Sequence, residues 1–127
     1  MKYIIDTHTL IWYIDGDNKL SKKAVSILQN TNNQIYVSKV SLWEIAIKIS
    51  ISKLNTSIPF PELEKFLLDN NFDILEIGFK HFEHLLNLPI HHNDPFDRII
   101  ICQSVIENIP IITYDNKFSL YDVRIIT

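Results

Sequence analysis

The chain has 127 residues and a mass of 14.9 kDa, with 46% hydrophobic and 21% charged residues, which is ordinary for one soluble globular domain spanning residues 1–127. No apolar run approaches the ~18 residues of a membrane span, and the single cysteine, Cys102, excludes a disulfide framework and a thiolate zinc site. A net charge of −3 and a pI of about 5.9 argue against unselective coating of nucleic acid, although a nuclease whose carboxylates bind metal remains compatible with them.

Strand-like and helix-like segments alternate along the chain. Ser21 and Pro61 are expected near helix starts, and Pro89 ends a helix. In chain order, we predict a strand at residues 3–6, helices at 7–14 and 21–30, a strand at 35–38, helices at 41–51 and from 61, a strand at 72–77, helices at 79–88 and 95–108, and strands at 111–114 and 123–126. The first residues enter a strand directly, without the apolar segment of a signal peptide, so we expect a cytoplasmic protein.

This alternation predicts an α/β fold with three layers, in which helices cover both faces of a central, mostly parallel sheet. Ile4-Ile5 and Ile111-Ile112 have the composition of central strands that are buried on both faces. In such sheets the functional crevice lies outside the carboxyl ends of the strands. Asp6 and Asp115 stand at those ends, so organisation and chemistry indicate the same place.

Acidic residues stand in apolar surroundings at several points of the chain: Asp6, Glu44, Asp97 and Asp115. A carboxylate in an apolar setting costs free energy unless something neutralises its charge. A hard divalent cation would neutralise the whole set at once. Because the candidate ligands are all oxygens, they favour Mg²⁺ or Mn²⁺, and a water acidified by such an ion can attack a phosphodiester.

Structural roles are open for the same acids. Asp6 is placed to cap the first helix, and Glu44 is placed to pair with Lys48 one helical turn later. Asp115 is placed in a turn. These structural interpretations need a separate explanation for each acid, whereas one metal site explains all of them.

Two acids open the helix predicted at residues 95–108. Asp94 precedes Pro95 and is expected to cap that helix. Asp97 then lies three residues after the cap, where an acid also favours the helix dipole and can complete a capping box.

Other residues with chemical potential are expected to be structural. We expect His91 and His92 in a surface loop, because adjacent loop residues seldom ligate one metal. His8 is a candidate for the cleft, although core packing is favoured for it. Trp12 and Trp43 are expected in the core, together with the neighbouring Tyr13; any of them that stays exposed would mark a protein interface.

Four segments, read in order, are similar to the PIN-domain ribonucleases: I-I-D-T-H at 4–8, S-L-W-E-I-A-I-K at 41–48, D-P-F-D-R at 94–98 and I-T-Y-D at 112–115. The match covers essentially the whole chain and more closely resembles the VapC toxins of bacterial toxin–antitoxin pairs. The resemblance carries the family's acidic quartet onto Asp6, Glu44, Asp97 and Asp115, with Asp94 nearby. It implies a PIN-like fold and a metal-dependent endoribonuclease.

The resemblance also implies roles and partners. Asp6, Asp97 and Asp115 would ligate Mg²⁺ or Mn²⁺, and Glu44 would orient or deprotonate the attacking water. Thr7 and Thr113 are possible accessory residues that hydrogen-bond these carboxylates. The implied partners are an RNA substrate, a cognate antitoxin protein and a second copy in a homodimer.

The sequence departs from the pattern of the family at the residue before the last acid. Many relatives carry Arg or Lys there, whereas this chain has Tyr114, which leaves one fewer cation for phosphate near the site.

Two other classes of protein compete with the nuclease. A phospho-receiver domain needs an aspartate near residue 55 and a lysine that closes the last strand, and the chain has Lys53-Leu54-Asn55-Thr56 and no such lysine. A catalytically inactive PIN-like binding module stays open as the alternative. Such a module would be expected to lose at least one of the four acids, and none is missing.

Overall fold

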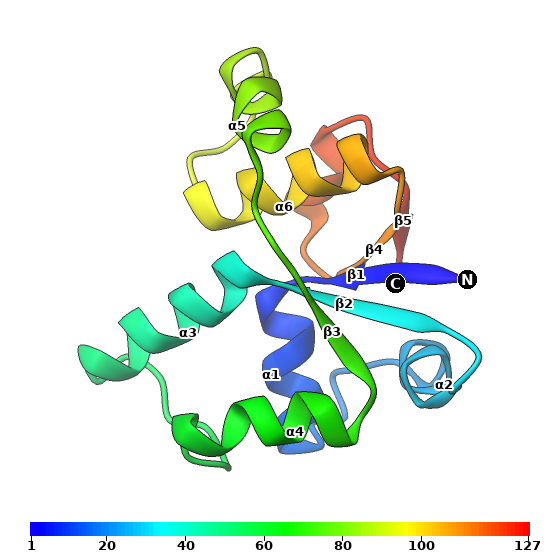
Figure 1. Cartoon of the computed structure of the whole chain (residues 1–127), viewed down its shortest axis with the longest axis vertical. Helices are drawn as coiled ribbons and strands as arrows, with labels where there is room; N and C mark the ends of the chain where they lie inside the picture. Colours follow the sequence, from blue (N-terminus) through cyan, green and yellow to red (C-terminus); the bar gives the residue numbers. More distant parts are fainter.

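The computed structural model describes residues 1–127 and contains one sheet of five strands in the order β3-β2-β1-β4-β5. All four strand pairings are parallel. The strands are β1 (Lys2–Ile5), β2 (Gln34–Ser38), β3 (Phe72–Leu75), β4 (Ile111–Ile112) and β5 (Ile125–Ile126). The parallel sheet predicted from the alternating pattern is confirmed, and β1 lies at its centre (Figure 1).

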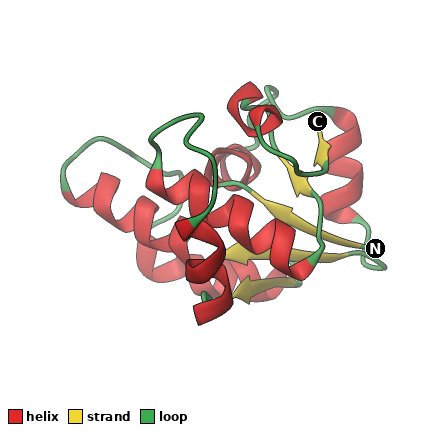
Figure 2. Ribbon diagram, turned by 90° about the horizontal axis from the view of Figure 1, so that it is seen from above, coloured by secondary structure: helices red, strands yellow, loops and turns green.

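Helices cover both faces of the sheet. They are α1 (Thr7–Asp15), α2 (Lys22–Gln29), α3 (Lys39–Ser50), α4 (Leu63–Asp69), α5 (Phe79–Leu86) and α6 (Pro95–Glu107), with short 3-10 helices η1 (Phe60–Glu62) and η2 (Asn116–Leu120). In Figure 1, α1, α2 and α4 lie below the strands, α5 and α6 lie above them, and α3 extends outward from the end of β2. The view from above in Figure 2 shows the strands enclosed between helices, which confirms the three-layer α/β/α fold.

The core has two halves, one on each face of the sheet. Ile5 and Ile112 point into the half formed with α1, α2 and α4. Their neighbours Ile4 and Ile111 point into the half formed with α6 and η2. All four side chains are fully buried, as predicted for central parallel strands. The central strands are therefore packed against helices on both faces of the sheet.

Several element boundaries differ from the prediction. The strand predicted at residues 72–77 ends at Leu75, because the Gln103 side chain donates to the carbonyls of Leu75 and Glu76. The helix predicted from residue 41 begins at Lys39, because Ser38 caps it.

Proline and turn chemistry explain two further differences. Pro61 lies in the 3-10 helix η1 rather than at the first position of α4. The strands predicted at 111–114 and 123–126 are shortened to two residues each, and η2, which the sequence pattern did not predict, follows β4. None of the helices has both the length and the apolar character that crossing a membrane would require.

Candidate active site

The predicted acids come from four segments that meet at the carboxyl edge of the sheet. Asp6 directly follows β1, and Glu44 lies on α3, which continues from the end of β2. Asp97 lies in the first turn of α6, and Asp115 follows β4. Figure 1 shows the starts of α1, α3 and α6 gathering where β1 and β2 end. The parallel topology thus brings together residues that are far apart in sequence.

The pKa of Asp97 shows that these acids lie close enough to affect one another. Burial, and after it the neighbouring charges of Asp94, Asp6, Glu44 and Asp115, together raise the pKa of its carboxyl from 3.8 to about 8. Only 9% of Asp97 is exposed to solvent. A carboxyl that feels four other carboxylates lies within a strongly negative cluster.

Asp6 is held by two hydrogen bonds. Its Oδ1 accepts from the Thr9 backbone N–H at 3.0 Å, which caps α1, and its Oδ2 accepts from the Thr113 hydroxyl at 2.6 Å. Burial raises the pKa of the Asp6 carboxyl, and these hydrogen bonds oppose that rise. The structural role considered for Asp6 is therefore real, and the same side chain also belongs to the acidic cluster.

Thr113 and Thr7 differ in what they do. Thr113 links two acids, because its Oγ1 donates to Asp6 and accepts from the Asp115 backbone N–H at 3.0 Å. The predicted contact of Thr7 with a carboxylate is wrong. Its hydroxyl donates to Ser41 Oγ at 2.9 Å, so Thr7 joins α1 to α3 instead.

Glu44 is the most enclosed acid on a helix. Its Oε2 accepts from Lys48 Nζ at 2.7 Å, which confirms the ion pair expected at this spacing. Its side chain is only 3% exposed, and Oε1 is buried without any hydrogen-bond partner. An unpartnered buried carboxylate oxygen is costly, so Glu44 retains an oxygen that is available to a cation or a water.

Asp94 and Asp115 have cap roles as well. Asp94 Oδ1 accepts from the backbone N–H groups of Phe96 and Asp97, which confirms it as the N-cap of α6. Asp115 caps η2 by accepting from the Lys117 N–H at 2.9 Å, and it is partly exposed. Asp97 does not complete a capping box, because its Oδ2 contacts His92 Nε2 at 3.3 Å.

The surface-loop prediction for His92 is therefore wrong. Its side chain is only 8% exposed and lies between Asp97 and the Tyr121 hydroxyl. Sequence reasoning missed this residue because its partner, Tyr121, lies 29 positions away.

Two further expectations about side chains are wrong. Trp43 is 62% exposed and packs edge-on against Phe96 at a centroid separation of 5.4 Å, so it is not a core residue. His8 is also exposed, and its charge lowers the pKa of the Asp6 carboxyl, which places it beside the acids.

The side chain of Tyr114, the residue before Asp115, makes contacts within the fold. Its ring packs against Trp12, and its hydroxyl accepts from the Ser21 backbone N–H. The side chain therefore joins the segment after β4 to α1 and the start of α2. A basic side chain does reach one of the predicted acids, because Lys48 forms an ion pair with Glu44.

The donor set suits a hard divalent cation, although the side chains as they stand are not gathered into a ligand shell. No group of three or more His, Cys, Asp or Glu side chains is placed to hold a metal ion. The acids instead take up the hydrogen-bond and ion-pair partners described above. All the same, the free Oε1 of Glu44 and the mutual repulsion at Asp97 are features that a bound cation would relieve, so the residues fit Mg²⁺ or Mn²⁺.

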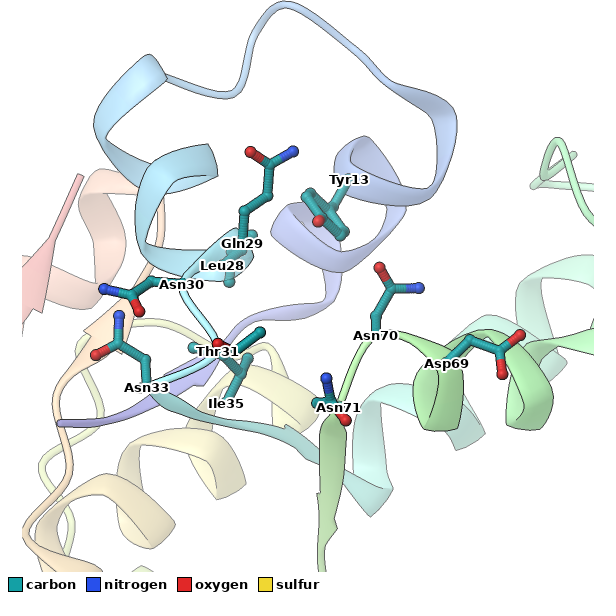
Figure 3. Close-up of a pocket in the computed structure, with 10 residues that line it drawn as sticks. All are labelled: Tyr13, Leu28, Gln29, Asn30, Thr31, Asn33, Ile35, Asp69, Asn70 and Asn71. Carbon is teal, nitrogen blue, oxygen red and sulfur yellow. The ribbon is translucent and has the colours of Figure 1, made fainter.

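A separate pocket lies at the other end of the sheet. It has a volume of about 300 Å³ and lies beside Ile35, near the start of β2, and Asn71, just before β3 (Figure 3). Amide side chains such as Asn33 and Asn70 line much of it, and Asp69 is its one acid. Because parallel strands place their amino ends opposite their carboxyl ends, this pocket is not part of the acidic cluster.

Comparison with known proteins agrees with the fold. The model of the PIN domain family matches residues 3–124. No curated protein matches the chain. VapBC2 from Rickettsia felis, solved bound to a DNA fragment from their promoter, contains a chain with a TM-score of 0.75 and 19% identity, and the alignment covers 99% of this chain and 98% of that one.

Two further solved structures are similar. DNA-bound VapBC from Salmonella typhimurium has a TM-score of 0.71 at 18% identity, covering 99% of this chain and 97% of that one. FitAcB from Neisseria gonorrhoeae has a TM-score of 0.66 at 15% identity, covering 98% and 96%. At such identities the likeness is one of fold. The family model, which spans nearly the whole chain, shows that this chain belongs to the PIN domain family.

Proposed function

We propose that this protein is a metal-dependent endoribonuclease that acts as the toxin of a toxin–antitoxin pair. PIN domains are generally nucleases. The observation that carries the proposal is that Asp6, Glu44, Asp97 and Asp115 meet at the carboxyl edge of the sheet, where the Asp97 carboxyl is subject to the charges of the other three acids and of Asp94. A protein retains such a repulsive cluster at a cost to stability, and a function that needs the charges accounts for it.

The residues divide into those that hold a cation and those that handle a proton. Asp6, Asp97 and Asp115 would hold Mg²⁺ or Mn²⁺, which when bound supplies positive charge to the phosphate and acidifies water. Glu44 would orient the attacking water or accept its proton, for which its buried and unpartnered Oε1 is available. Thr113 fixes the carboxylate of Asp6 through the 2.6 Å hydrogen bond.

The test is RNA cleavage by the purified protein with and without divalent cations. We expect cleavage in Mg²⁺ or Mn²⁺, complete loss in excess EDTA, and recovery when the cation is restored. A protein with net charge −3 should also cut a few RNAs in a mixed pool rather than all of them. Activity that persists in EDTA would overturn the metal mechanism, and absence of cleavage with every RNA would favour the inactive binding module.

We further propose an antitoxin partner and a homodimer, in the cytoplasm where the RNA substrates are. VapBC complexes are among the similar structures, which supports a protein partner for this fold. For the second copy, α5 carries Phe79, Phe82 and Leu86 at positions i, i+3 and i+7, with exposures of 85%, 47% and 83%. An exposed apolar face of this kind is typical of a protein interface.

The antitoxin should bind partly through charge. A metal-free cluster of Asp6, Asp94, Asp97 and Asp115 attracts an arginine or lysine from a partner segment. We expect the affinity for the cognate antitoxin to fall when salt is raised, and to fall further when Asp94 or Asp115 is changed to Asn. Calorimetry over a range of salt concentrations measures both effects. An affinity that ignores salt and both substitutions would place the antitoxin elsewhere on the surface.

A further inference from the structure

A chain of side-chain contacts leads from Tyr121 through His92, in the loop before α6, to Asp97. Tyr121 follows η2, is 6% exposed, and has its hydroxyl 2.8 Å from His92 Nδ1. The opposite ring nitrogen, His92 Nε2, lies 3.3 Å from Asp97 Oδ2. All three side chains are largely buried, so these contacts persist without competition from bulk water.

The hydroxyl of Tyr121 receives several hydrogen bonds, which decides where its own proton goes. Arg98 Nη1 donates to it at 3.1 Å, and the backbone N–H groups of His91 and His92 donate at 3.3 Å each. The acceptor that remains within reach is His92 Nδ1. The tyrosine proton therefore points to Nδ1, and His92 carries its own proton on Nε2, from which it donates to Asp97.

Arg98 anchors the start of this chain. Besides Tyr121, its guanidinium donates to the backbone carbonyls of Pro89 at 2.9 Å and Leu88 at 3.3 Å. It thereby ties the loop after α5 to the first turn of α6. Arg98 stands next to Asp97 in sequence, yet its contact with that acid runs through Tyr121 and His92.

We propose that His92 is a positioning residue, set in its Nε2–H tautomer by Tyr121, that holds Oδ2 of Asp97 and leaves Oδ1 to face a divalent cation. The inference rests on the proposed metal-dependent function. Hydrogen bonds of this kind behind a metal ligand fix its orientation, and their loss typically lowers metal affinity or activity about 10–100-fold. A carboxylate free to rotate would have to be ordered again each time a cation binds.

The test combines a spectroscopic readout with cation binding. In metal-free wild type, long-range ¹H–¹⁵N spectra of the histidine rings should show His92 with its proton on Nε2. Tyr121→Phe should convert this into a mixture of tautomers. The affinity for Mn²⁺, measured by calorimetry, should fall about tenfold in Tyr121→Phe and further in His92→Ala. His92→Gln, whose amide can donate to Asp97, should recover part of the loss.

His81 provides the matched control, because it is another buried histidine that contacts a carboxylate. Its Nδ1 accepts from the Gly78 N–H at 2.9 Å and its Nε2 lies 3.1 Å from Glu107, away from the acidic cluster. His81→Gln should leave the Mn²⁺ affinity unchanged, even if the protein becomes less stable. A fall equal to that of His92→Ala would make the His92 effect one of general stability and overturn the positioning role.

The remaining outcomes separate this inference from the proposed function. If wild type binds Mn²⁺ and Asp97→Asn does not, but Tyr121→Phe and both His92 variants bind as wild type does, the positioning role fails and the metal site stands. If wild type binds no Mn²⁺, both fail. If the His92 ring carries protons on both nitrogens at neutral pH, its contact with Asp97 is an ion pair and Tyr121 does not select a tautomer. That result would overturn the positioning role as proposed.

Discussion

Asp97→Asn is expected to abolish RNA cleavage and to leave the metal-free protein at least as stable as wild type. Asparagine keeps an oxygen that accepts from His92 Nε2, but it removes the charge on which the other acids act. Loss of a metal ligand should lower cleavage by a factor of at least about 100. Removing one of several mutually repelling charges should stabilise the fold rather than weaken it.

The stability effect has a defined pH dependence. The Asp97 carboxyl releases its proton near pH 3.8 in the unfolded chain and near pH 8 in the folded protein. Because the folded pKa is the higher one, the stability that this group contributes is fully present below pH 3.8 and is lost as pH rises through about 8. Asp97→Asn has no such loss, so its advantage over wild type should grow across this window.

Urea unfolding in EDTA at several pH values between 5 and 9 measures this difference. The cleavage assay in Mg²⁺ is run on the same preparations, so that folding and activity are compared in one sample. An Asp97→Asn protein that unfolds more easily than wild type at pH 8.5, or one that still cleaves RNA, would contradict the assignment of this residue.

Two substitutions of Asp6 are expected to separate the roles of its side chain, which caps α1 and also belongs to the acidic cluster. Asp6→Asn and Asp6→Ala should both lose cleavage, but only Asp6→Ala should be clearly destabilised. Asparagine is itself a good N-cap: its amide oxygen can replace Oδ1 in accepting from the Thr9 N–H, and its amide NH2 then stands in the place of Oδ2 and can donate to the Thr113 hydroxyl oxygen. Alanine removes the cap of α1, a loss of about 0.5–2 kcal/mol. It also leaves the buried Thr113 hydroxyl without this acceptor, which adds about 1 kcal/mol or more.

A matched cap on another helix supplies the control. Ser21 caps α2 by accepting from the Ala24 N–H at 3.0 Å, and it is not among the acids. Ser21→Ala should lose a similar amount of stability and keep full cleavage. If Asp6→Asn retained cleavage, or if Ser21→Ala lost it in a folded protein, activity would follow the stability of the helix ends and not the charge at Asp6.

Local sequence patterns were sufficient to predict the layers of the fold and the positions of Asp6 and Asp115 at the ends of strands. Ile4-Ile5 and Ile111-Ile112 marked buried parallel strands, and an acid at the end of such a strand belongs at the carboxyl edge of the sheet. Asp6 shows why competing interpretations did not exclude each other. A carboxylate has two oxygens, so one caps a helix while the other takes part in the cluster.

What the sequence did not reveal depends on contacts between distant segments. His92 acquires its role from Tyr121, and no spacing pattern encodes that pairing. Trp43 was expected in the core because its neighbours are apolar, but α3 extends beyond the sheet and leaves this face of the helix uncovered. Thr7 follows Asp6 directly, yet the first turn of α1 directs its hydroxyl to Ser41. Packing between layers decided each of these cases.

The central claim is that Asp6, Asp97 and Asp115 hold a divalent cation and that Glu44 adds its negative charge beside them. Calorimetric titration of Mn²⁺ into metal-free protein tests it most directly, with wild type compared with Asp6→Asn, Glu44→Gln, Asp97→Asn and Asp115→Asn. We predict that wild type binds Mn²⁺, that Asp6→Asn and Asp97→Asn lose the binding, and that the other two variants bind more weakly. Binding of equal strength in wild type and all four variants, or no binding to the folded wild type, would contradict the claim.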